Sequence, residues 1–133
     1  MLYFAYSVPY TYTDLQAYIA AKSALPGMQR KMQHRVLCRT IAGNVCDLLT
    51  ITCYSGNVAA ISTRPAVILT ARVHPGETQA SWMLFGILEF LLSDHADAEI
   101  LFANPSPITH LSIPQEICCD PLANNFFKHS TFF

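Results

Sequence analysis

The chain has 133 residues, of which 52% are hydrophobic and only 13% are charged. That length suffices for one domain with a core and is too short for two domains of ordinary size. A typical soluble domain has roughly a quarter of its residues charged, so the composition fits either a membrane protein or a segment whose apolar faces other parts of a larger protein cover.

Two features argue against a membrane protein and against nucleic-acid binding. The longest apolar stretch, residues 82–92, contains Glu89 and is well short of the ~20 residues that span a bilayer. The net charge is −1 and no basic run occurs.

The first residues lack the positive region of a secretory signal, and the five cysteines have no C-x-x-C spacing. We therefore expect a cytoplasmic protein without a disulfide framework.

The first third of the sequence predicts a strand, a helix and a hairpin. Apolar residues alternate over residues 2–8, which is typical of a strand, and Pro9 ends it. Thr13 and Gln16 have capping-box spacing and predict a helix over about residues 14–23, whose apolar face holds Leu15, Tyr18 and Ile19. The β-rich runs 36–41 and 45–53, separated by Ala42-Gly43-Asn44, predict a hairpin.

A strand, a tight turn and a helix are predicted next. The nearly continuous apolar run AVILTARV, residues 66–73, is typical of a central strand buried on both faces. Residues 78–92 predict a helix, in which Met83, Ile87 and Leu91 recur at helical spacing. The carboxyl end of a strand is where open α/β sheets usually bind ligands.

The turn between this strand and helix carries His74-Pro75-Gly76-Glu77. A catalytic zinc ion needs about three protein ligands and one open position, and imidazole and carboxylate groups are suitable ligands. Three-residue spacing on a turn lets His74 and Glu77 converge on one point. Gly76 permits backbone angles that a side chain would forbid, and Pro75 stiffens the turn. Alone, H-x-x-E is a weak motif that most often marks a surface histidine and glutamate.

The surrounding sequence makes the motif specific. The stretch ARVHPGETQASW resembles the metal-binding stretch of the metallocarboxypeptidases and, among them, of the cytosolic carboxypeptidase subfamily. YFAYSVPYTYTDLQAYI is similar to the segment that opens that subfamily's catalytic domain, and VLCRTIAGNVCDLLTIT to its first hairpin. The resemblance extends over about residues 3–100, with the three motifs in the family's order.

The resemblance implies an α/β fold that is part of the metallocarboxypeptidase fold, with a mixed β-sheet flanked by helices. It also implies one zinc ion, Zn(2+), with His74 and Glu77 as two of its ligands. The implied reaction is removal of C-terminal or side-chain-linked glutamate from acidic, tubulin-like protein tails. The family's second histidine ligand, its Asn-Arg pair for the substrate carboxylate and its general-base glutamate lie further downstream. None is located here, so the catalytic and substrate-binding residues are unknown.

The resemblance divides the chain into three parts. Residues 1–9 are expected to end a preceding β segment, residues 10–101 to form the N-terminal part of a zinc carboxypeptidase catalytic domain, and residues 102–133 to be a divergent, poorly ordered tail. We expect a metallocarboxypeptidase that is truncated and inactive as this chain. The alternative is a non-catalytic fragment or pseudoenzyme that acts as a binding or regulatory module.

Other candidate residues have simpler explanations. His110 and His129 are possible third metal ligands, but solvated loop histidines are the preferred interpretation. His95 is expected on the surface after a helix, and His34 is expected to be exposed. Arg72 either faces the site or has a structural partner. Two aromatic side chains of the helix, Trp82 and Phe85, are expected in the core.

Overall fold

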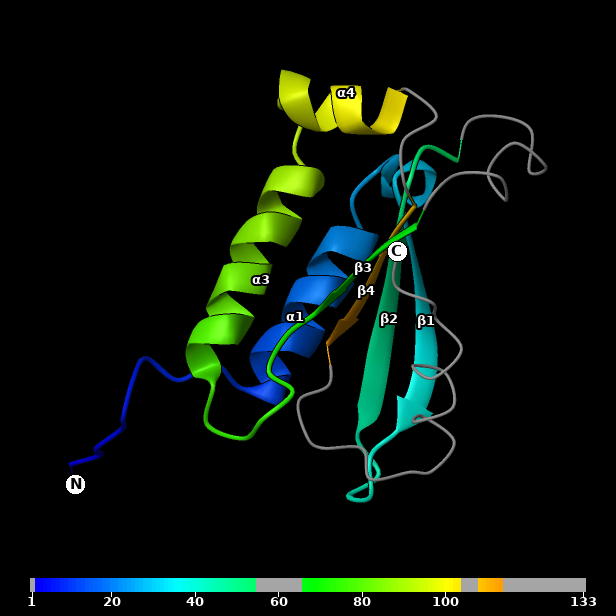
Figure 1. Cartoon of the computed structure of the whole chain (residues 1–133). Coiled ribbons are helices and arrows are strands. Elements are labelled where there is room, and N and C mark those ends of the chain that lie inside the picture. The colour runs from blue at the N-terminus through cyan, green and yellow to red at the C-terminus, as the bar shows by residue number, and fades with distance from the viewer. Residues whose placement is uncertain (1, 55–65, 104–107, 114–133) are drawn as a thin grey trace.

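The sheet of this protein is mixed and has its helices packed against it (Figure 1). The structure is a computed structural model that describes residues 2–54, 66–103 and 108–113. The elements in chain order are α1 (Tyr12–Ser23), a short 3-10 helix η1 (Met28–Arg30), β1 (Met32–Arg39), β2 (Val45–Ile51), β3 (Ala66–Thr70), α3 (Thr78–Leu91), α4 (Ala96–Ala103) and β4 (Ile108–Ile113). The predicted α/β class with a mixed sheet flanked by helices is confirmed.

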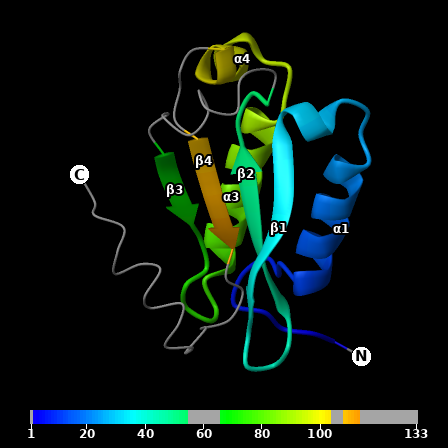
Figure 2. The same cartoon turned by 90° about the vertical axis from the view of Figure 1, so that its right-hand side faces the viewer.

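Four strands of the described residues form the sheet in the order β1-β2-β4-β3. Figure 2 shows the strands with α3 behind them. β1 and β2 form the predicted hairpin, and β1 begins at Met32 rather than at residue 36. A bulge lies between Val36 and Cys38, and Gly43 in the connecting turn has φ of 85°. β2 pairs antiparallel with β4, whereas β3 pairs parallel with β4.

Strand β4 was not predicted, because residues 102–133 were assigned no fold. Ile108–Ile113 lies between β2 and β3, so part of that tail belongs to the sheet. In the described sheet β3 is consequently an edge strand rather than the expected strand buried on both faces. Val67 of β3 is 41% exposed. The division of the chain at residue 102 stays a prediction.

Helix α1 confirms the predicted helix, but it begins two residues earlier and its cap is different. Thr11 is the N-cap: its hydroxyl accepts from the backbone N–H of Asp14, and the Asp14 carboxylate accepts from the backbone N–H of Thr11 at 2.7 Å. The predicted Thr13–Gln16 box was therefore wrong. Gln16 is not a cap, because its amide donates to Asp47 of β2 at 2.6 Å.

Residues 2–8 do not form the predicted strand. Residues 2–5 have no assigned secondary structure, and Tyr6 and Ser7 form a bend. A strand needs a neighbour for its backbone groups, and no described strand pairs with this segment. The side chains of Leu2, Phe4 and Tyr6 are almost fully exposed.

Helix α3 was predicted at the right place, but of the three residues noted for their helical spacing only Leu91 is buried. Leu84, Leu88 and Leu91 are buried against the sheet, whereas Met83 is 70% exposed and Ile87 is also exposed. Phe85 packs against the core as expected, but Trp82 is 41% exposed and was wrongly expected in the core. No helix of the described residues is long and apolar enough to cross a membrane.

The core lies between the sheet and the helices α1 and α3, which cover the same face (Figure 1). Along β2, Asp47, Leu49 and Ile51 alternate with less buried residues and are fully buried. Asp47 is thus a carboxylate inside the core. Besides Gln16 it binds His34 of β1, whose Nε2 lies 2.6 Å from Oδ1 and whose side chain is 34% exposed.

We predict that Asp47→Ala lowers the free energy of unfolding by about 1–3 kcal/mol, because it leaves the partly buried Gln16 amide without its acceptor. The matched control is Asp94→Ala, which removes a carboxylate that is 94% exposed and pairs with Lys31 at 2.9 Å. Exposed pairs contribute about 0–1 kcal/mol. Urea unfolding followed by fluorescence of the single tryptophan, Trp82, measures both. Equal losses in the two variants would contradict the prediction.

Candidate metal site at the β3–α3 junction

A seven-residue loop, residues 71–77, connects β3 to α3 and carries the H-x-x-E motif. Gly76 has φ of 86°, which confirms the expected need for a glycine at this position. The loop begins at the buried Ala71 and closes in a hydrogen-bonded turn, in which the N–H of Thr78 donates to the carbonyl of Gly76 at 2.9 Å. The motif therefore lies between a strand and a helix, as predicted, but the strand ends at Thr70 rather than at residue 73, so a longer loop replaces the expected tight turn.

His74 and Glu77 are accessible from solvent at this turn. His74 is exposed, and Glu77 is partly buried at the N-cap position of α3. The Glu77 side chain makes no capping hydrogen bond to the helix, so its carboxylate is not occupied in that way. An imidazole and a carboxylate three residues apart are a donor set that suits zinc.

A third ligand does not join these two within the described residues, where no cluster of three or more His, Cys, Asp or Glu side chains that could hold a metal is found. His110 lies inside β4, next to Ile68 of β3 in the register, rather than on the loop. His129 lies outside the described residues. The roles of His74 and Glu77 as ligands stay predictions.

Arg72 precedes the motif. The sequence left two alternatives for its side chain, a position facing the site or a structural partner, and the structure shows a partner. Its Nη1 donates to the backbone carbonyl of Tyr10. Its φ of 55° makes it the one non-glycine residue with a positive φ in the described part of the chain. A non-glycine residue rarely adopts this conformation unless the surrounding structure imposes it.

The segment Ser7–Tyr10 contacts both ends of the loop, which the sequence analysis did not foresee. The hydroxyls of Ser7 and Thr78 form a hydrogen bond, and the indole Nε1 of Trp82 donates to the carbonyl of Val8 at 3.2 Å. The rings of Tyr10 and Trp82 meet edge to face with centroids 5.0 Å apart. These contacts span more than 60 residues of sequence, so no local pattern announces them.

His95 is exposed as expected but has a different role from the one inferred. Its Nδ1 accepts a hydrogen bond from the backbone N–H of Asp97 at 3.2 Å, and its carbonyl accepts from the N–H of Glu99 at 3.0 Å. His95 therefore stabilises the start of α4 rather than the end of α3. It lies at the opposite end of α3 from His74 (Figure 1).

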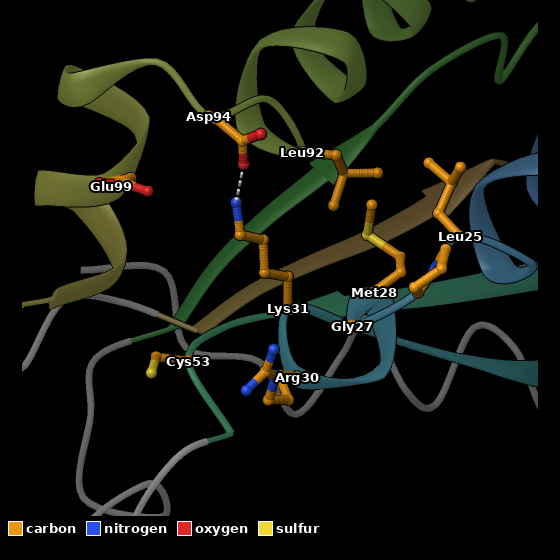
Figure 3. A pocket seen from close by; sticks show the side chains of 10 residues that line it. Leu25, Gly27, Met28, Arg30, Lys31, Cys53, Leu92, Asp94 and Glu99 are labelled. Carbon is orange, nitrogen blue, oxygen red and sulfur yellow. Dashed lines mark hydrogen bonds and ion pairs between the residues drawn. The ribbon is translucent and has the colours of Figure 1, made fainter.

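A cavity of about 660 Å³ also lies at that opposite end. Figure 3 shows its lining by side chains from the α1–β1 connection, the end of β2, the end of α3 and α4. Lys31 crosses it to bind Asp94, and this hydrogen bond lowers the pKa of the Asp94 carboxyl. The cavity does not contain His74 or Glu77 and so is not a pocket of the candidate metal site.

The solved structures that resemble this chain are metallocarboxypeptidases. The metallo-carboxypeptidase of Burkholderia cenocepacia matches with a TM-score of 0.64 and 26% identity, over 78% of this chain and 26% of that one. A putative carboxypeptidase A of Shewanella denitrificans matches with a TM-score of 0.61 and 26% identity, over 81% of this chain and 25% of that one. The described residues thus form part of a metallocarboxypeptidase fold, a class whose name implies a metal cofactor.

The sequence relatives narrow this class to a subfamily. Cytosolic carboxypeptidase 2 of Xenopus tropicalis is 48% identical over 99 residues, and the human protein of that name is 44% identical over the same length. Cytosolic carboxypeptidase 1 of Mus musculus is 45% identical over 105 residues. Each match covers 74% of this chain. The predicted resemblance to the cytosolic carboxypeptidases is confirmed.

These relatives are much longer than this chain, which spans about a tenth of their length. No family model matches the chain.

Two glycines allow the backbone conformation of the β3–α3 loop to be tested. A Cβ added at Gly76 or at Gly86 of α3 would meet nothing within 4 Å, so backbone conformation alone decides the outcome. We predict that Gly76→Ala destabilises the chain by about 1–2 kcal/mol, because φ is 86°. Gly86→Ala should stabilise it by about 0.5–1 kcal/mol, since alanine is favoured within a helix. Urea unfolding gives both values, and a stabilising Gly76→Ala would contradict the described turn.

Proposed function

We propose that the β3–α3 loop is part of the active site of a zinc carboxypeptidase and that His74 and Glu77 are two of the metal ligands. The observation that carries the proposal is the position of the motif. An imidazole and a carboxylate, three residues apart, lie on a turn at the carboxyl end of a strand in part of a metallocarboxypeptidase fold.

Zinc in such a site lowers the pKa of a bound water and polarises the scissile carbonyl. The chain's own contribution is to hold the ligands. Gly76 allows the sharp turn between them, and the Glu77 side chain at the N-cap position of α3 makes no capping hydrogen bond. His74, being exposed, can approach a metal without rearrangement of the core.

The substrates that we propose are acidic protein C-termini, with tubulin-like tails that end in or carry glutamate as the example, and the location that we propose is the cytoplasm. The support is the similarity to proteins named cytosolic carboxypeptidases. A carboxypeptidase acts on the C-terminal residue of a peptide, so an exposed flexible tail is a suitable substrate.

We also propose that the 133-residue chain alone does not turn over substrate. The described residues place His74 and Glu77 in one loop, and they contain no group of three or more His, Cys, Asp or Glu side chains that could hold a metal. A catalytic zinc site needs about three protein ligands with one open position. On the same observation, a non-catalytic binding or regulatory module remains the second candidate function.

The metal part of the proposal is tested by calorimetry of the 133-residue chain with zinc. We predict weak binding that His74→Ala and Glu77→Gln each reduce by at least about tenfold, because each residue would supply one of only two protein ligands. The matched controls, His95→Ala and Glu99→Gln, change exposed residues at the far end of α3 and should leave the affinity unchanged. Zinc binding that persists in a His74→Ala, Glu77→Gln double variant would place the metal elsewhere.

The catalytic part requires a complete enzyme. Residues 3–100 of this chain would replace the matching segment of mouse cytosolic carboxypeptidase 2, a 46% identical relative. We expect the graft to keep zinc-dependent release of glutamate from a peptide that the parent enzyme cleaves. His74→Ala in the graft should reduce the rate by at least about a hundredfold, whereas His95→Ala should not. A folded but inactive graft would contradict the proposed function.

A further inference from the structure

Hydrogen bonds to an earlier segment of the chain are made on both sides of the loop that carries His74 and Glu77. Before the motif, the guanidinium of Arg72 binds the carbonyl of Tyr10. After the motif, Thr78 binds the hydroxyl of Ser7, and Trp82 binds the carbonyl of Val8. The partners in these three contacts belong to one stretch of four residues, Ser7–Tyr10, which we call the clamp segment.

The clamp segment is anchored at its C-terminal residue, Tyr10, so it can hold the loop in position. Tyr10 is only 5% exposed and belongs to the hydrophobic core. Its burial, followed by the nearby charge of Asp14, raises the pKa of its hydroxyl. Directly after it, Thr11 caps α1. The carbonyl that Arg72 binds is therefore held between a buried ring and a capped helix.

The backbone at Arg72 points to the same conclusion. A φ of 55° is unfavourable for an arginine and persists where other contacts impose it. Glycine adopts this conformation more easily. An arginine at this position combines an unfavourable backbone with a side chain that reaches the clamp segment, so the side-chain contact is the feature that glycine cannot supply.

We propose that Arg72 and the clamp segment Ser7–Tyr10 position the β3–α3 loop and thereby set its affinity for metal. This inference rests on the proposed function, because it concerns the same two ligands. Arg72 and Ser7 are positioning residues: they act on His74 and Glu77 through the backbone on either side of them. Groups that hold metal ligands in place commonly change metal affinity by about 10–100-fold when they are removed.

Two substitutions release the loop from opposite ends. Arg72→Gly removes the guanidinium while it relieves the unfavourable φ, and Ser7→Ala removes the hydroxyl that binds Thr78. The matched control is Arg39→Ala, since Arg39 also donates from Nη1 to a backbone carbonyl, that of Gly43 at 3.0 Å, but in the hairpin turn. If Arg72 served only to accommodate the backbone, Arg72→Gly would leave the loop as ordered as before or more ordered.

The experiment has a metal-free and a metal-bound arm, both with the 133-residue chain. Amide hydrogen exchange over residues 73–80 without metal should accelerate about tenfold in Arg72→Gly and in Ser7→Ala, and stay within about twofold in Arg39→Ala. Zinc affinity, measured by competition with a chromophoric chelator, should fall about tenfold in the same two variants and not in the control. Urea unfolding of each variant separates these local effects from global destabilisation.

The possible failures can be told apart. Unchanged exchange over residues 73–80 in both variants would overturn the inference, as would faster exchange with unchanged zinc affinity. If zinc binding to the parent chain is insensitive to His74→Ala, the proposed function fails instead. The metal-free exchange data then decide alone whether the clamp holds the loop.

Discussion

The burial of one face of the sheet beneath α1 and α3 is the constraint on which the rest of this structure depends. Leu49 and Ile51 of β2 are fully buried there, together with Leu15 of α1 and Leu88 of α3. Because α3 must lie on this face, the chain leaving β3 has to reverse direction within a few residues. That reversal places the H-x-x-E loop at the carboxyl ends of the parallel strands β3 and β4, where α/β folds bind ligands.

Local patterns in the sequence were sufficient for three of the elements, but not for β4, for residues 2–8 or for the buried faces. The positions of α1, the hairpin and α3 follow from periodicity and turn residues. In α3, however, most residues from Trp82 onward are apolar, so helical spacing alone did not distinguish the buried Leu91 from the exposed Met83 and Ile87. β4 was missed for a related reason: flanking prolines argue against a strand, and its place comes from pairing with β2 and β3.

In the candidate site, too, some features follow from the local sequence and others from contacts between distant residues. The place of His74 and Glu77 between a strand and a helix and the positive φ of Gly76 could be predicted because motif and turn are contiguous in sequence. The contacts of Arg72 and Thr78 with the segment before α1 could not, since residues more than 60 positions apart leave no periodic signal. Distant contacts also explain why residues 2–8 do not form the predicted strand. The carbonyl of Val8, at the end of this segment, accepts a hydrogen bond from Trp82 of α3 rather than from a neighbouring strand.

The residues that hold the β3–α3 loop lie close to one another in the fold. Among the described residues, three side-chain hydrogen bonds connect Arg72, Thr78 and Trp82 with the segment that precedes α1. The segment shared with the cytosolic carboxypeptidases is only about a tenth of those proteins. The geometry of the β3–α3 loop is therefore set within a small unit, whereas a catalytic zinc site in general also needs about three protein ligands and a general base. The low charge content and the exposed apolar stripe of α3, formed by Met83, Ile87 and Phe90, agree with a unit whose surface other protein normally covers.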